Sequence, residues 1–306
     1  MNKNLTGKID ITATLACIGA LVFWAVGANF IKYITGYLDL WTQNMLRYIA
    51  ACLFWLPFLV MSCARNKCRW PLWRITLLPA LINIIMQSLC TAAFYYLEPA
   101  FIDLAGKSST LMIICLSLIF FVEERVLLKS RRFWFGAVLS IIGILGVMLN
   151  EETLGSPRTL TGMIIILCYA LTFALYTICV KTVFRNTDSR IGFSLMSIYT
   201  VIGLSALAFL FGHPADCLKI PPFLWFCVIV SGVTSIGLSH VLYYVAIKRI
   251  GATIPALTLF ATPLLVFAIS SITFHERLSL TQCLFGLILL SGSALAIYSQ
   301  QHLKTE

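Results

Sequence analysis

The sequence predicts an all-α integral membrane protein whose ten transmembrane helices form two inverted repeats of five helices. Composition indicates the membrane, because 60% of the 306 residues are hydrophobic and only 11% are charged, against about 25% in soluble domains. The second observation is a series of ten apolar runs of about 20 residues, the length of helix that crosses the hydrocarbon layer. These runs are continuous rather than alternating, which excludes a membrane β-barrel.

Charges, glycines or prolines bound each apolar run. The expected helices lie near residues 11–33, 41–62, 75–97, 101–122, 133–149, 160–181, 191–211, 222–245, 252–273 and 279–299. The first run is longer than the apolar core of a secretory signal, which has about 7–15 residues, so we expect it to remain in the mature protein. Because no soluble domain interrupts the runs, we expect the repeats to occupy 1–150 and 151–306.

Lysines and arginines predict the orientation of the helices. Of the 22 in the chain, sixteen fall in the segments that would be cytoplasmic if the N-terminus were inside, and three fall in the opposite loops. Cytoplasmic loops are enriched in these residues, so we expect both termini in the cytoplasm. The remaining three lie within or at the ends of helices: Lys32, Arg47 and Lys107. The concentration of positive charge in short loops is an orientation signal and gives no support to nucleic-acid binding.

The two halves of the chain show weak internal similarity. WAVGANFIK at 24–32 aligns with FALYTICVK at 173–181, and a Tyr-Tyr pair occurs at 95–96 and again at 243–244. Glu124-Arg125 similarly corresponds to Glu276-Arg277. Five helices is an odd number, so the second half must enter the membrane inverted relative to the first. Inverted halves are typical of secondary transporters, which bind their solute at the interface between them.

The chain resembles the drug/metabolite transporter superfamily, in particular the bacterial EamA-type members with ten helices. The resemblance implies alternating-access transport of small metabolites, often amino acids or their relatives. It is strongest in ATIPALTLFATPLLVFAISSITFHERLS at 252–279, although the first half has Ser108, Ser109 and Thr110 where Pro263 would have its counterpart. The other residues that support it are Trp24-Ala25, Asn29-Phe30, Arg47-Tyr48 and Tyr243-Tyr244.

Lys107 is the first candidate for solute binding, because it interrupts the otherwise apolar run LAGKSSTLMIICL. A lysine near the centre of a membrane helix costs about 2.5–3.5 kcal/mol, so its position requires an explanation. It can face the cavity and hold a carboxylate or phosphate of the solute. Alternatively, it can pair with Asp103 one turn away or extend toward the external surface.

Other polar and aromatic residues within the runs are further candidates. His240 can bind solute, accept a coupling proton, or hydrogen-bond to a neighbouring helix. Asn83 and Gln87 can line the cavity or join helices, while we expect a structural role for Arg47. Pro255 and Pro263 are expected to bend the ninth helix and act as hinges. The complete set of solute-binding candidates is Trp24, Asn29, Asn83, Gln87, Lys107, Tyr176, His240 and Tyr244.

No motif in the sequence indicates an enzyme. HExxH, GxSxG and glycine-rich phosphate-loop patterns are missing, so we expect no catalytic residues, metal site or cofactor. The predicted function is secondary active transport of a small polar metabolite, either an amino acid or a related carboxylate. The alternative is a nucleoside-containing metabolite or a hydrophobic cation. The expected partners are this solute and membrane lipid, with a possible homodimer through the glycine-containing fifth and tenth helices.

Overall fold

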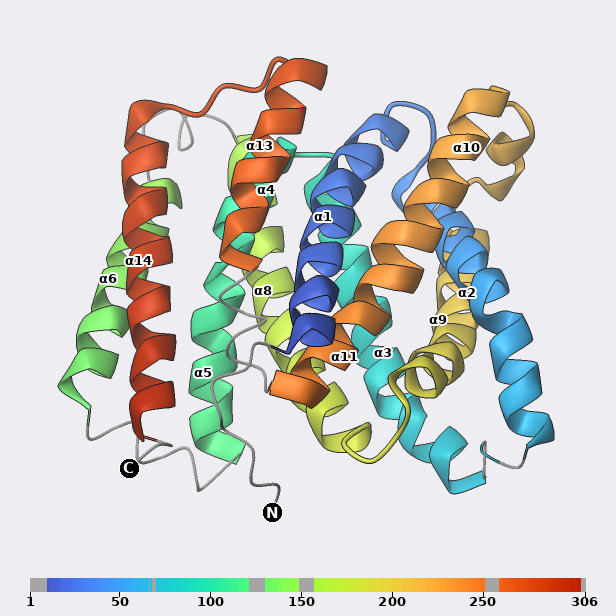
Figure 1. Ribbon diagram of the computed structural model, residues 1–306. Helices are drawn as coiled ribbons and strands as arrows, with labels where there is room; N and C mark the ends of the chain where they lie inside the picture. Colours follow the sequence, from blue (N-terminus) through green and yellow to red (C-terminus); the bar gives the residue numbers. More distant parts are fainter. Residues whose placement is uncertain are drawn as a thin grey trace.

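The computed structural model describes residues 10–65, 67, 70–120, 130–148, 157–250 and 259–303, and helices dominate these ranges. Figure 1 shows the helices assembled side by side into a bundle. The elements are α1 (Ile11–Ile34), α2 (Leu40–Ala64), α3 (Trp70–Ala93), α4 (Pro99–Gly106), α5 (Ser108–Phe120), α6 (Arg131–Met148), α8 (Pro157–Val183), α9 (Ser189–Phe211), η2 (Pro214–Leu218), α10 (Pro222–Ser231), η3 (Gly232–Leu238), α11 (Ser239–Ile250), η4 (Leu259–Ala261), α13 (Thr262–Thr273) and α14 (Leu280–Leu303).

Six helices of the described chain are long and apolar enough to cross a membrane: 11–34, 40–64, 70–93, 157–183, 189–211 and 222–249. Two shorter apolar segments lie at 262–273 and 280–292. Each of the ten expected ranges contains a described helix, but the expected number of ten complete spans is not confirmed. The main difference is in the expected helix at 101–122, which is divided at Lys107 into α4 and α5.

The two halves have opposite orientations. Lys32, in the last turn of α1, donates to the Phe94 and Leu97 carbonyls beyond the end of α3, at 3.4 and 3.0 Å. Arg158, in the first turn of α8, donates to the Tyr95 carbonyl in the same segment at 2.7 Å. The end of α1 and the start of α8 therefore lie together, so these two helices are antiparallel. Moreover, α1 begins and α14 ends at the same end of the bundle (Figure 1).

Each long helix of the first half packs against a helix of the second half. The pairs are α1 with α11, α2 with α9, α3 with α8, α4 with α13, and α6 with α14. A further contact between the halves, of α1 with η3, requires glycine, since a Cβ at Gly27 would lie 2.2 Å from the Cβ of Ser235. Close approach at small residues is the usual basis of helix association in membranes. The interface between the halves is therefore the core of the protein.

Buried amides and hydroxyls join α2, α3 and α9. The Nδ2 atom of Asn83 donates to the hydroxyls of Tyr48 and Thr200, at 2.8 and 3.1 Å. Thr91 donates to Asn44 Oδ1 at 2.7 Å, and Asn44 in turn donates to the Gln87 carbonyl at 3.2 Å. Since lipid offers no hydrogen-bond partners, these polar side chains must be satisfied inside the bundle.

Glu276, between α13 and α14, caps a helix of the other half. Its carboxylate accepts hydrogen bonds from the backbone N–H groups of Ala100 and Phe101, at 3.0 and 3.1 Å, in the first turn of α4. It also accepts a hydrogen bond from the Ser270 hydroxyl. The residue that precedes α4, Glu98, makes no side-chain capping bond. Because the first N–H groups of a helix need external acceptors, this one carboxylate links the start of α4 to α13.

Glycines of α6 and α14 lie at the contact between these two helices. A Cβ at Gly143 would lie 2.4 Å from the backbone nitrogen of Leu289, and one at Gly292 would lie 2.6 Å from that of Ser140. These glycine faces therefore serve the contact between the two helices of one molecule. The homodimer expected through these helices stays a prediction.

We predict that Gly143→Ala destabilises the protein, because the added methyl group forces α6 away from α14. The expected loss is about 1–3 kcal/mol, seen as a lower midpoint of thermal unfolding of the purified protein in detergent. Gly36→Ala is the matched control, since the atom nearest to its Cβ would be 3.6 Å away. Equal midpoints for the two variants would contradict the close contact.

A second prediction concerns the hydroxyls of Tyr176 in α8 and Tyr244 in α11, which hydrogen-bond to one another inside the core. Changing either tyrosine to phenylalanine leaves the other hydroxyl buried without this partner, which should lower the free energy of unfolding by about 1–3 kcal/mol. The double variant removes both hydroxyls, so its loss of stability should be smaller than the sum of the losses in the two single variants. Thermal unfolding of the four proteins measures this coupling, with Tyr96→Phe, at a side chain that is 39% exposed, as the control. Additive effects would mean that the two hydroxyls do not interact.

Candidate functional site

A cavity lies between the two halves of the bundle. Its volume is about 130 Å³, which is room for about four waters at the roughly 30 Å³ that each occupies in the liquid, so the cavity suits a small solute. Residues of α1, α2, α3, α4 and α5 line it from the first half. Residues of α8, η3, α11 and α13 line it from the second. This is the position at which inverted-repeat transporters bind their solutes.

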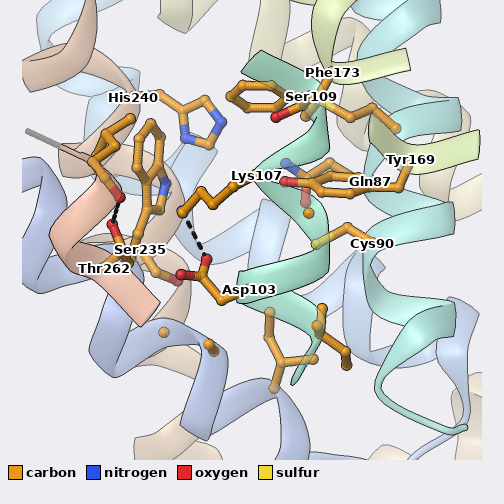
Figure 2. Close-up of a pocket in the computed structure, with 18 of the residues that line it drawn as sticks. Gln87, Cys90, Asp103, Lys107, Ser109, Tyr169, Phe173, Ser235, His240 and Thr262 are labelled. Carbon is orange, nitrogen blue, oxygen red and sulfur yellow. Dashed lines mark hydrogen bonds and ion pairs between the residues drawn. The ribbon is translucent and has the colours of Figure 1, made fainter. Parts of the chain in front are cut away.

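Lys107 and Asp103 form an ion pair in the cavity wall. Nζ of Lys107 donates to Oδ1 of Asp103 at 3.1 Å, and the side chains are 14% and 22% exposed. Both residues line the cavity, and Figure 2 shows them turned toward one another there. Oδ2 of Asp103 is buried without a hydrogen-bond partner in the described chain. Lys107 therefore faces the cavity and also pairs with Asp103, while its holding of a solute anion stays a prediction.

The break between α4 and α5 presents further polar groups to the cavity. Around Lys107 the backbone hydrogen bonds change to a tighter pattern, with Lys107 N bound to the Leu104 carbonyl at 3.1 Å and Thr110 N bound to the Lys107 carbonyl at 3.0 Å. The hydroxyl residues that follow, Ser109 and Thr110, line the cavity. Interrupted helices are the usual source of polar contacts in transporter sites, because irregular backbone is tolerated where it borders a cavity.

Aromatic rings surround His240, another residue of the cavity lining. The ring centroids of Trp24 and Phe193 lie 5.5 and 5.9 Å from that of His240, and both His240 and Trp24 line the cavity. Nδ1 of His240 lies 3.0 Å from the Ile236 carbonyl oxygen. Because a carbonyl only accepts, Nδ1 carries the hydrogen in this contact, which leaves the lone pair on Nε2.

The internal repeat also places an aromatic pair in the cavity. Trp24 and Phe173 occupy the first positions of the two aligned segments, and both line the cavity. Gln87 lines it as well, from α3. Phe173 is not one of the solute-binding candidates from the sequence, although its alignment with Trp24 could have indicated that it lines the cavity.

Four candidates lie outside the cavity lining. Asn83 belongs to the hydrogen-bonded network of α2, α3 and α9, while Asn29 donates to the Ala25 carbonyl of its own helix at 3.0 Å. The hydroxyls of Tyr176 and Tyr244 hydrogen-bond to one another, and their ring centroids lie 6.3 and 6.4 Å from that of His240. Side-chain type alone could not separate these residues from the cavity-lining ones, because both kinds are buried polar groups in apolar helices.

Of the two expected hinges, Pro263 lies in the first turn of α13, where proline is accommodated without loss of a helical hydrogen bond. Pro255 lies outside the described residues.

Several cavity-lining residues were not expected from the sequence as solute contacts. Arg47 does have the predicted interhelical role, because it donates to Ser231 Oγ at 2.6 Å, but it also lines the cavity. Tyr243 was noted only as part of a motif. The others include Cys90, Ser235 and Thr262. Within the described ranges, no group of three or more His, Cys, Asp or Glu residues is placed to hold a metal ion.

Comparison with known proteins identifies the family. The model of the EamA-like transporter family matches residues 11–149 and again 160–298, which agrees with the two repeats. A solved crystal structure, described only as that of a protein, is 16% identical and has a TM-score of 0.64. The match covers 93% of this chain and 96% of that one, and it shows a shared fold alone. No curated protein matches the chain. The two family matches together cover most of the sequence, so this multi-pass membrane protein belongs to the EamA-like transporter family, within the drug/metabolite transporter superfamily.

Proposed function

We propose that the protein is a secondary carrier that moves a small zwitterionic solute, such as an amino acid, across a bacterial cytoplasmic membrane. Both chain ends would face the cytoplasm, in keeping with the distribution of lysines and arginines. Membership of a transporter family, the inverted halves and the cavity between them support a carrier that works by alternating access.

The ion pair of Lys107 and Asp103 is the observation that supports a zwitterionic solute. The two side chains offer an ammonium and a carboxylate next to one another in the cavity wall. An amino acid carries the complementary pair of groups. Its carboxylate would accept from Lys107, and its ammonium would donate to Oδ2 of Asp103, which lacks a partner in the described chain.

The aromatic residues of the cavity support contact with the organic body of the solute. Trp24, Phe173 and Tyr243 come from both halves and line the cavity. Such surfaces would also suit the ring of a nucleoside-containing metabolite, which is the second candidate. A hydrophobic cation is disfavoured, because Arg47 and Lys107 both line the same cavity.

Alternating access requires that contacts at one end of the bundle break while those at the other end form. At the end where α3 leads into α4, the contacts of Arg158 and Glu276 join the two halves. We infer that these contacts open when the cavity is exposed on that side. The break at Lys107 would supply the bending.

We predict that Lys107→Gln lowers amino acid uptake by at least about tenfold, because the solute carboxylate loses its charged donor and Asp103 is left buried without a counter-charge. The measurement is uptake of radiolabelled L-amino acids by proteoliposomes, with saturation and counterflow used to separate a carrier from a channel. Lys219→Gln is the matched control, since Lys219 forms a similar pair with Asp216 at 2.9 Å but its side chain is 78% exposed. Unchanged uptake by a folded Lys107→Gln protein would show that Lys107 does not bind the solute.

A further inference from the structure

Arg47 is an enclosed cation in α2 that has no acidic partner in the described chain. Only 2% of it is exposed. Its Nε donates to Ser231 Oγ at 2.6 Å and its Nη2 to Ser235 Oγ at 3.2 Å, and both acceptors are neutral hydroxyls of the second half. Among the described residues, Nη1 has no hydrogen-bond partner and no ion pair includes Arg47.

The second half of the chain positions Arg47 closely. Gly232 begins η3, a π-helical segment, and a Cβ there would lie 2.3 Å from the carbonyl oxygen of Arg47. The hydroxyls of Ser231 and Ser235, which bind the guanidinium, lie just before and within this segment. Single π-helical turns inside longer helices occur frequently at functional sites. Arg47 and Ser235 both line the cavity, so Arg47 and one of the two serines that hold its guanidinium lie at the cavity wall.

The charges of the cavity do not balance. Among the described residues that line it, Arg47 and Lys107 are cationic and Asp103 is the only carboxylate. Asp103 is already paired with Lys107, so the charge of Arg47 is uncompensated. An unpaired charge inside a membrane protein is costly, and an anion with good hydrogen-bond acceptors would relieve that cost. A second carboxylate on the solute would supply such an anion.

We propose that Arg47 is a second anion-binding residue and that the transported solute is an α-amino dicarboxylate. This inference rests on the proposed function, in which Lys107 and Asp103 hold the α-carboxylate and the ammonium. The side-chain carboxylate would then accept from Nη1 of Arg47, the donor for which the described residues offer no partner. Guanidinium suits this role because its planar array of donors matches a carboxylate. The solute would be an acidic amino acid with a net negative charge, which balances the excess positive charge of the cavity.

The test compares L-glutamate with L-glutamine, which have nearly the same shape but differ by one carboxylate. Each radiolabelled compound is taken up by proteoliposomes that contain the full-length protein. We expect the wild type to take up glutamate with an apparent affinity at least about tenfold higher than that for glutamine. Arg47→Gln should lower the apparent affinity for glutamate by at least about tenfold and change the apparent affinity for glutamine by less than about threefold. If the role of Arg47 were purely structural, the variant would instead lower the apparent affinity for both compounds alike.

Arg190→Gln is the matched control, because Arg190 is half-exposed, pairs with Asp188 at 2.9 Å and is not among the cavity-lining residues. It should leave the glutamate preference unchanged. If Arg47→Gln does not fold, Arg47→Lys takes its place, and the glutamate preference should fall there too, because lysine keeps the charge but lacks the planar donors; an undiminished preference in folded Arg47→Lys likewise overturns the role of Arg47. A preference for glutamine in the wild type, or an undiminished preference for glutamate in folded Arg47→Gln, overturns the role of Arg47. If the wild type takes up neither compound nor any other amino acid, the proposed function itself fails.

Discussion

The structure depends on one constraint, namely that polar groups within the membrane must find their partners inside the protein. Asn83, Tyr48 and Thr200 satisfy one another between helices, and Glu276 satisfies the first N–H groups of α4. A charge that cannot be fully satisfied in this way needs water or solute, and is tolerated only beside a cavity. The location of the incompletely paired charges therefore coincides with the site at which solute would bind.

The inverted repeat explains why the cavity has contributions from both halves. Helices pack mainly across the interface, as in the pairs of α1 with α11 and α3 with α8. Breaks in regular helix occur on both sides of the cavity, at Lys107 in the first half and at η3 in the second. The two breaks are chemically different, because one presents an ion pair and the other presents hydroxyls to Arg47. A pseudosymmetric scaffold thus forms an asymmetric site, which is needed to orient a solute with unlike ends.

Contacts between the halves differ in character along the bundle. Around α6 and α14 the contact is formed by glycines packed against backbone, which leaves little freedom to separate. Near the cavity the contacts are aromatic edges and hydrogen bonds, such as those of Trp24 with His240 and Tyr243. At the end of α3, the hydrogen bond of Arg158 and the capping bonds of Glu276, which water can replace, join the two halves. This gradient fits a protein in which one helix pair stays together while the rest rearranges.

The sequence by itself determined the membrane setting, the approximate positions of the helices and the inverted repeat, because composition, run length and loop charge act locally along the chain. It also singled out Lys107, since one charge in an apolar run is conspicuous. Only the tertiary structure decided which polar residues meet: it brought Arg47, Gln87 and Lys107 to one cavity and left Asn83 in a network between helices. The physical reason is that lipid-facing and core-facing sides of these helices are both apolar, so no amphipathic pattern indicates which face a given residue occupies.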